Sequence, residues 1–80
     1  MARIRSFEKS TQDVRPHPTE VDCEHQVIDA GEVKLLHLST FGSDHRASGH
    51  KPSQTLQLDE AAARELMDIL TAAFPGVRAR

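Results

Sequence analysis

The sequence has no Trp and no Tyr, and only three Phe among 80 residues, so large aromatic side chains for a core are scarce. Its single cysteine, Cys23, excludes an intrachain disulfide. Hydrophobic residues make up 38% of the chain, which provides one small core near the lower size limit of a domain that folds alone. A core of this size often needs a metal or a second subunit. The composition therefore favours a homodimer, with metal as the weaker option.

Long apolar runs are also missing. No stretch reaches the length of a transmembrane helix, and no hydrophobic segment follows Arg3 and Arg5 as a signal peptide would require. Together with the lone cysteine, this predicts a cytoplasmic protein with no membrane partner. No phosphate-binding loop, dinucleotide fingerprint or zinc-protease motif is present. Because a small core offers little room for a substrate pocket, we expect no enzyme, no catalytic residues and no cofactor.

Two adjacent segments have the period-two pattern of half-buried strands. Residues 21–28 place apolar or weakly polar side chains, including Cys23, on one side and charged or amide side chains on the other. A turn around Gly31 then leads into residues 32–40, which predicts a hairpin. In the second strand Leu35 lies on one face and Leu36 on the other. Either a bulge switches the pattern midway, or both faces of this strand are covered.

The strongest local pattern is a strand that runs directly into an amphipathic helix. Residues 53–58 alternate, with Leu56 and Leu58 expected to point inward. Asp59 suits the N-cap of the helix, and Pro75 with the following glycine ends it. Apolar positions spaced by three and four form one stripe, which we expect to pack on the strand: Ala62, Leu66, Ile69, Leu70, Ala73 and Phe74.

These elements predict one α+β domain at residues 20–76. The expected fold is an antiparallel sheet of three to four strands followed by one C-terminal helix, β-β-β-β-α, assembled as a dimer. Residues 1–19 are expected to be a flexible N-terminal arm or an edge strand, because two prolines interrupt the segment that follows Phe7. Residues 77–80 are expected to be a tail.

Two constellations invite a chemical interpretation. Five histidines, among them His45 and His50 in one loop, invite a metal, but their spacing matches no zinc module, so no metal ligand is predicted. In one alignment of the hairpin, Cys23 lies across from His37, and a cysteine–histidine pair can form a thiolate nucleophile. The alternative, which we favour, is that Cys23 lies on the inner face as a small hydrophobic residue.

The net charge of −2 requires any nucleic-acid site to be a local patch. Single-stranded nucleic acid is bound by cationic grooves together with rings on which bases stack. Candidates for these roles are cations along the middle of the chain, one phenylalanine, and two N-terminal arginines: Lys34, Phe41, Arg46, Lys51, Arg3 and Arg5. The alternative is a solvated hairpin loop beside a core phenylalanine.

The run Thr55-Leu56-Gln57-Leu58-Asp59-Glu60, followed by Leu66, resembles the strand-to-helix junction of the positive cofactor four family of transcriptional coactivators and their bacterial relatives. The polar loop at residues 42–52 stands where that family has a basic turn. The chain differs from the family in having Ser53 and Gln54 where a glycine usually enters the last strand. The resemblance implies a curved antiparallel sheet followed by one helix, a homodimer, and single-stranded DNA as partner.

The expected function is therefore a small homodimeric, non-enzymatic module that binds single-stranded nucleic acid, in transcription regulation. The alternative is a small protein-interaction or regulatory dimer without nucleic-acid contact.

Overall fold

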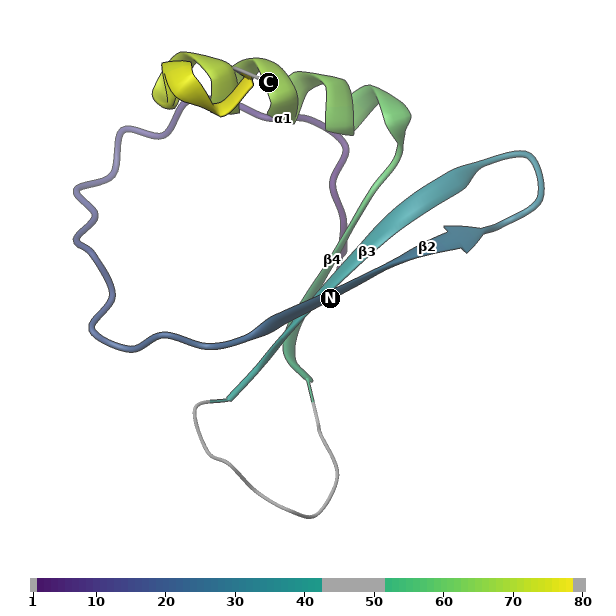
Figure 1. The fold of residues 1–80 in the computed structure, drawn as a ribbon, viewed down its shortest axis with the longest axis horizontal. Coiled ribbons are helices and arrows are strands. Elements are labelled where there is room, and N and C mark those ends of the chain that lie inside the picture. Colours follow the sequence, from purple (N-terminus) through teal and green to yellow (C-terminus); the bar gives the residue numbers. More distant parts are fainter. Residues whose placement is uncertain (1, 43–51, 79–80) are drawn as a thin grey trace.

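Four strands precede one helix in the chain (Figure 1). The structure, a computed structural model, describes residues 2–42 and 52–78. The elements in chain order are β1 (Ala2–Arg3), β2 (Cys23–Asp29), β3 (Lys34–Phe41), β4 (Pro52–Leu58), α1 (Glu60–Ala73) and a 3-10 turn, η1 (Pro75–Arg78). This arrangement confirms the predicted α+β order of strands followed by one C-terminal helix.

The strands form one mixed sheet in the order β1-β4-β3-β2. The pairs β2–β3 and β3–β4 are antiparallel, as expected from the hairpin pattern. β1 is parallel to β4, with Ala2 opposite Leu56, and the Ile4 amide donates to the Gln57 carbonyl at 2.8 Å. The first residues are thus a two-residue edge strand, and the segment between β1 and β2 makes a wide arc away from the sheet (Figure 1).

The turn between β2 and β3 depends on Gly31, whose φ is +85°. Glycine has no Cβ and adopts this left-handed conformation without the steric cost that other residues incur. The Ala30 amide donates to the Val33 carbonyl at 2.8 Å, which closes the turn. The predicted hairpin is confirmed in this region.

The pairing along β3 decides between the two interpretations of its apolar pattern. The register with β2 and β4 is continuous until a shift between Thr40 and Phe41, so no bulge switches the faces at Leu35 and Leu36. Leu35 is 8% exposed on one face, while Leu36 and Leu38 are half-buried on the other. β3 therefore carries apolar side chains on both faces.

Asp59 alone separates β4 from α1 and caps the helix as predicted. Its carboxylate Oδ1 accepts a hydrogen bond from the Ala62 amide at 2.9 Å. Its other oxygen lies 3.5 Å from the Arg3 guanidinium of β1. The Ala62 amide, aided by Arg3, holds the pKa of Asp59 below its ordinary value, against the opposing effect of desolvation. The helix ends at Ala73, and the amide of the C-cap residue Phe74 still donates to the Leu70 carbonyl before Pro75.

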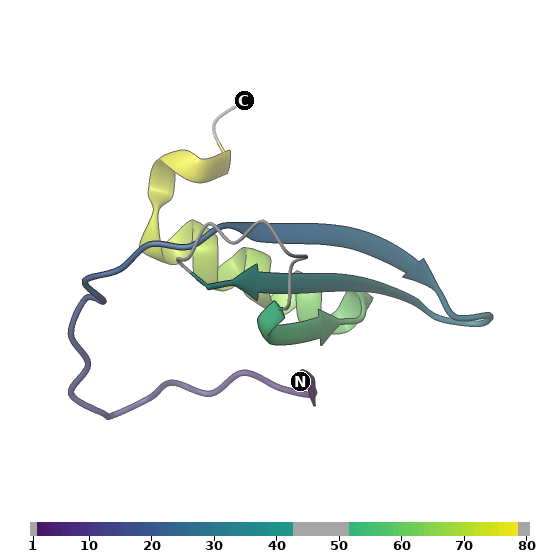
Figure 2. The ribbon, with the colours of Figure 1, turned by 90° about the horizontal axis from the view of Figure 1, so that it is seen from below.

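The core is smaller than the sequence predicts. Its buried apolar residues, among those described, are Leu35, Leu58 and Ala62. The expected packing of the helix stripe on β4 is wrong beyond the first turn, because Ile69 and Phe74 are 46% and 61% exposed. With a joint of one residue, α1 starts at the end of β4 and then turns away from it, so that most of the helix stands apart from the sheet (Figure 1). In the view from below, the helix lies behind the strands (Figure 2).

Candidate interaction surface

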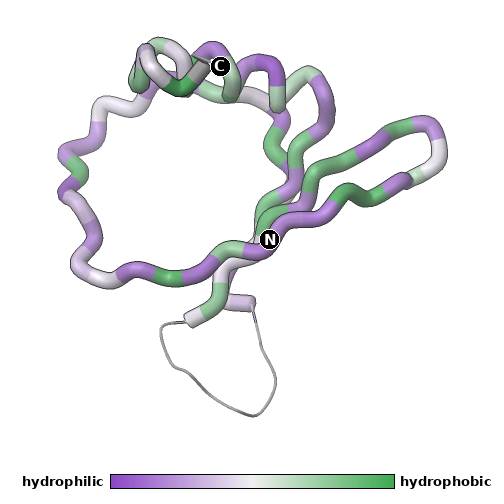
Figure 3. Tube along the Cα trace, in the orientation of Figure 1, coloured by the Kyte–Doolittle hydropathy of each residue, from purple (hydrophilic) through white to green (hydrophobic). Residues whose placement is uncertain are grey.

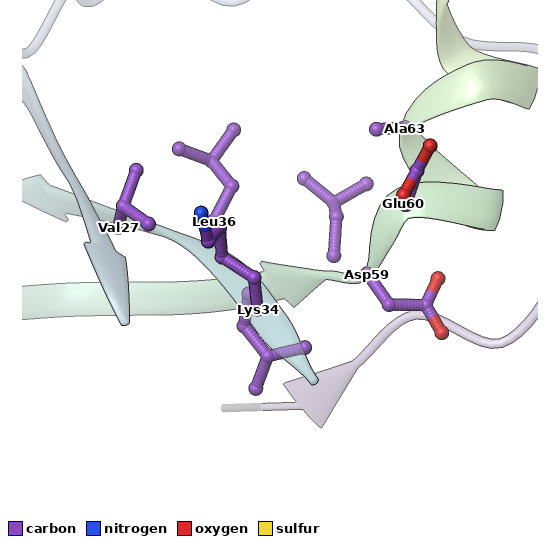
Figure 4. A pocket seen from close by; sticks show the side chains of 8 residues that line it. Val27, Lys34, Leu36, Asp59, Glu60 and Ala63 are labelled. Atoms are coloured by element: carbon purple, nitrogen blue, oxygen red, sulfur yellow. The ribbon is translucent and has the colours of Figure 1, made fainter. Parts of the chain in front are cut away.

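An apolar hollow lies in the angle between the sheet and the start of α1 (Figure 4). Its volume is about 240 Å³. Val27 of β2 and Leu36 of β3 point to the side of the sheet on which Ala63 of the helix lies. The hollow is lined by aliphatic side chains with three charged residues beside them: Val27, Lys34, Leu35, Leu36, Leu58, Asp59, Glu60 and Ala63.

The hollow continues along one face of the sheet. Directly paired residues of an antiparallel sheet project to the same face, so the pairs Val27–Leu36, Leu36–Leu58 and Leu38–Leu56 place five aliphatic side chains together. We call these five residues the sheet patch. Leu58 is buried, but Val27 is 62% exposed and Leu56 is 42% exposed. Figure 3 shows hydrophobic segments of the three strands side by side next to the helix.

A row of apolar side chains continues along α1 from the hollow to the end of the helix. It consists of Ala63, Met67, Leu70 and Phe74, spaced by four, three and four residues, and we call it the helix seam. At 100° per residue these four positions fall within a sector of about 60°. Met67 is 62% exposed and Leu70 is 37% exposed. The seam begins at the hollow because Ala63 lines it.

The chain exposes more surface than a folded monomer of its size. Its accessible surface is 7493 Å². A compact monomer of this mass exposes roughly 4,800 Å². The radius of gyration is 14.9 Å, against roughly 12 Å for a compact chain of this length. The extended segment between β1 and β2 contributes to this excess, and so do the exposed side chains of the sheet patch and helix seam.

Of the predicted nucleic-acid residues, the four that the structure describes are not gathered into one patch. Lys34 and Phe41 begin and end β3, so they lie roughly 23 Å apart along the strand. Arg3 is 3.5 Å from the Asp59 carboxylate, while Arg5 is exposed in the segment after β1. Arg46 and Lys51 lie outside the described residues.

The Cys–His pair is also not assembled. Cys23 pairs with Thr40 across the hairpin, whereas His37 pairs with Gln26 and shares a 3.0 Å hydrogen bond with Gln57. Cys23 is exposed, so its predicted burial on an inner face is wrong, because no element of the described chain covers that end of β2. Among residues 2–42 and 52–78 no group of three metal-binding side chains comes together, and His45 and His50 lie outside these ranges.

The sequence contained a signal for the helix seam that the predicted stripe did not use. That stripe left out Met67 and Ala63 and was assigned to the core as a whole. The 4-3-4 spacing of the seam is the pattern by which helices pack against other helices. The helix seam can be recognised as a surface distinct from the core only because, in the structure, α1 leaves the sheet after Ala62.

Comparison with protein-family models, curated proteins and solved structures gives no match for this chain. Within the part of the chain that the structure describes, no helix has the length and apolar character needed to span a membrane.

Proposed function

We propose that this chain is a non-enzymatic interaction module that works as a homodimer, in which each copy covers the sheet patch and helix seam of the other. The observation that carries the proposal is the continuous apolar surface formed by these two features on one side of the molecule. In residues 2–42 and 52–78 three apolar residues are buried, which is a small core for a chain with 38% hydrophobic residues. A second copy supplies the missing half of that core.

The size of the uncovered surface favours a second copy as the occupant. A standard protein interface buries about 800 Å² on each partner. The excess surface of this chain over a compact monomer is roughly three times that area, and the exposed sheet patch and helix seam contribute to it together with the extended segment between β1 and β2. Obligate homodimers have interfaces that resemble a domain core cut in half, and an apolar hollow beside a row of aliphatic side chains fits that description.

The non-enzymatic part of the proposal rests on the surroundings of the reactive side chains. Cys23 and His37 belong to different cross-strand pairs, so the thiol has no histidine opposite it. The shifted pKa of Asp59 is explained by its role as a helix cap and by Arg3. The hollow is lined mainly by aliphatic side chains, which suit burial of another apolar group better than general acid or base chemistry.

Light scattering across a range of protein concentrations tests the homodimer. The Val27→Lys variant is expected to shift the mass from dimer to monomer, because it places an ammonium group within the sheet patch, where a second copy would desolvate it. Val14→Lys is the matched control, since Val14 is a similarly exposed valine, at 68%, in the segment between β1 and β2. A wild-type chain that remains monomeric at all concentrations, or a Val27→Lys dimer as tight as the control, contradicts the proposal. Circular dichroism checks that both variants fold.

Single-stranded nucleic acid is the second candidate partner of the dimer. The antiparallel strands β2–β4 followed by one helix are the observation that favours it, because the resemblance implies such a sheet followed by a helix, and Lys34 is an exposed cation on β3. Titration with labelled oligonucleotides at two salt concentrations is the test. Binding should be tighter at the lower concentration, because neutralised phosphates release counterions. If a dimer shows no binding at low salt, the regulatory dimer without nucleic-acid contact is the function that stands.

A further inference from the structure

The helix seam is self-complementary when it is opposed to a copy of itself in the reverse direction. Its four members are arranged symmetrically about a point between Met67 and Leu70. A two-fold axis through that point places Met67 of one copy against Leu70 of the other, and Ala63 against Phe74. A two-fold interface requires this kind of reciprocity, in which residue i meets residue j and residue j meets residue i.

Side-chain size favours the antiparallel arrangement. In it, the smallest member of the seam, Ala63, faces the largest, Phe74, at both ends of the contact, and two side chains of similar size meet at the centre. Alternation of large and small residues across facing positions lets helices approach evenly. A parallel arrangement would place two phenylalanines together at one end and two alanines at the other. It would also align the two helix dipoles, whereas the antiparallel arrangement opposes them.

The hollow gives the phenylalanine a place to go. It lies beside Ala63, at the end of α1 opposite to Phe74, and it has a volume of about 240 Å³. Ala63 and Phe74 are eleven residues apart, which is three helical turns plus about 20°, so they share one face of the helix. An antiparallel partner helix therefore brings its Phe74 ring to the mouth of the hollow, between Val27, Leu36 and Leu58.

Charges beside the seam do not oppose this contact. Arg64 lies on one flank and forms a 2.7 Å ion pair with Glu60 of its own helix. The other flank carries Leu66 and Ala73, which extend the apolar surface toward the sheet. Truncation of aromatic rings that fill well-packed, desolvated pockets of an interface commonly costs the most in binding.

From this geometry, and resting on the homodimer proposed above, we infer that the two copies pack their α1 helices antiparallel, with Phe74 of each copy in the hollow beside Ala63 of the other.

Directed cross-linking tests the register. In a Cys23→Ser background, the variants Ala63→Cys and Phe74→Cys are prepared separately, then mixed, unfolded together and refolded so that their subunits exchange. Mild oxidation should produce a covalent dimer in the mixture, in which about half of the dimers are mixed by statistics. Each variant oxidised alone should stay uncross-linked, because its two cysteines lie at opposite ends of the contact.

A second measurement follows the strength of the dimer. Phe74→Ala is expected to raise the dimer dissociation constant by at least about 30-fold. Val77→Ala, which truncates another exposed apolar residue just beyond the helix, is the matched control and should change it little. Sedimentation velocity over a dilution series measures both.

The outcomes separate the register from the homodimer itself. If light scattering shows a dimer but single variants cross-link alone, the helices are parallel and the inferred register is wrong. If no sample cross-links and Phe74→Ala dimerises as tightly as Val77→Ala, the interface lies elsewhere, and the homodimer still stands. A wild-type chain that is monomeric throughout removes both proposals.

Discussion

Replacement of Leu58 by alanine should remove a large share of the stability of this fold. Leu58 is 2% exposed at the point where β4 passes into α1. The change deletes three carbon atoms, each worth about 0.8 kcal/mol of burial. Leucine-to-alanine changes in cores cost about 2.7–5.0 kcal/mol, more where the cavity cannot collapse. Because the apolar hollow already adjoins Leu58, neighbouring side chains can relax into the gap, and we expect a loss of about 3 kcal/mol.

Urea denaturation at one fixed protein concentration, followed by circular dichroism at 222 nm, measures this loss. The chain is expected to have a total stability of roughly 4–12 kcal/mol, so the variant should unfold at a clearly lower urea concentration with an unchanged slope. Val14→Ala truncates an exposed apolar side chain away from the core and should change the stability by less than about 0.5 kcal/mol. A Leu58→Ala loss below about 1 kcal/mol would refute the assignment of this junction as the centre of the core.

Two further changes test the helix cap and the hairpin turn. The pKa of Asp59 is lowered from 3.8, so its contribution to stability should be complete above that pH and lost as the pH falls through the lower folded value. Asp59→Asn keeps an acceptor oxygen but removes this charge. The urea midpoint should therefore change less between pH 6 and pH 3 in the variant than in the wild type, and an equal change in both would contradict the role of the charge. Gly31→Ala should lower the free energy of unfolding by about 1 kcal/mol in urea denaturation, because φ is +85° at this position. Gly76→Ala is the control, since among the described glycines only Gly31 has a positive φ. A loss no larger than the control's would contradict a strained turn.

The parts of the fold that the sequence predicts are those set by local chemistry. Asp59 caps the helix through an amide three residues away, and Gly31 shapes a turn within its own neighbourhood. Alternation in residues 53–58 and the spacing of the helix stripe depend on backbone period alone. Each of these signals lies within a few consecutive residues of the sequence. The strands and the helix could therefore be predicted without knowing which other segments pack against them.

The parts that the sequence does not predict depend on direction and on distant segments. The angle at which α1 leaves β4 follows from a joint of one residue, and it leaves Ile69 and Phe74 uncovered where a stripe alone suggests burial. Residue type and order in the sequence point to Lys34 and Phe41 as one nucleic-acid site, but the length of β3 separates them. The candidate interaction surface could not be predicted because it combines residues from β2, β3, β4 and α1.

The pairing of β1 with β4 affects how the chain folds and with what it can associate. Ala2 and Leu56 are 54 positions apart in the sequence, so their pairing closes the longest loop in the sheet, whereas the β2–β3 turn closes within a few residues. We expect β1 to dock last during folding and to detach first on local opening, since only two residues hold it in register. While docked, it pairs with Leu56 and Gln57 at the outer edge of β4; once detached, it leaves the backbone groups of these two residues open to a strand from another molecule. We therefore expect this two-residue strand to shield that stretch of the β4 edge from strand addition whenever it is docked.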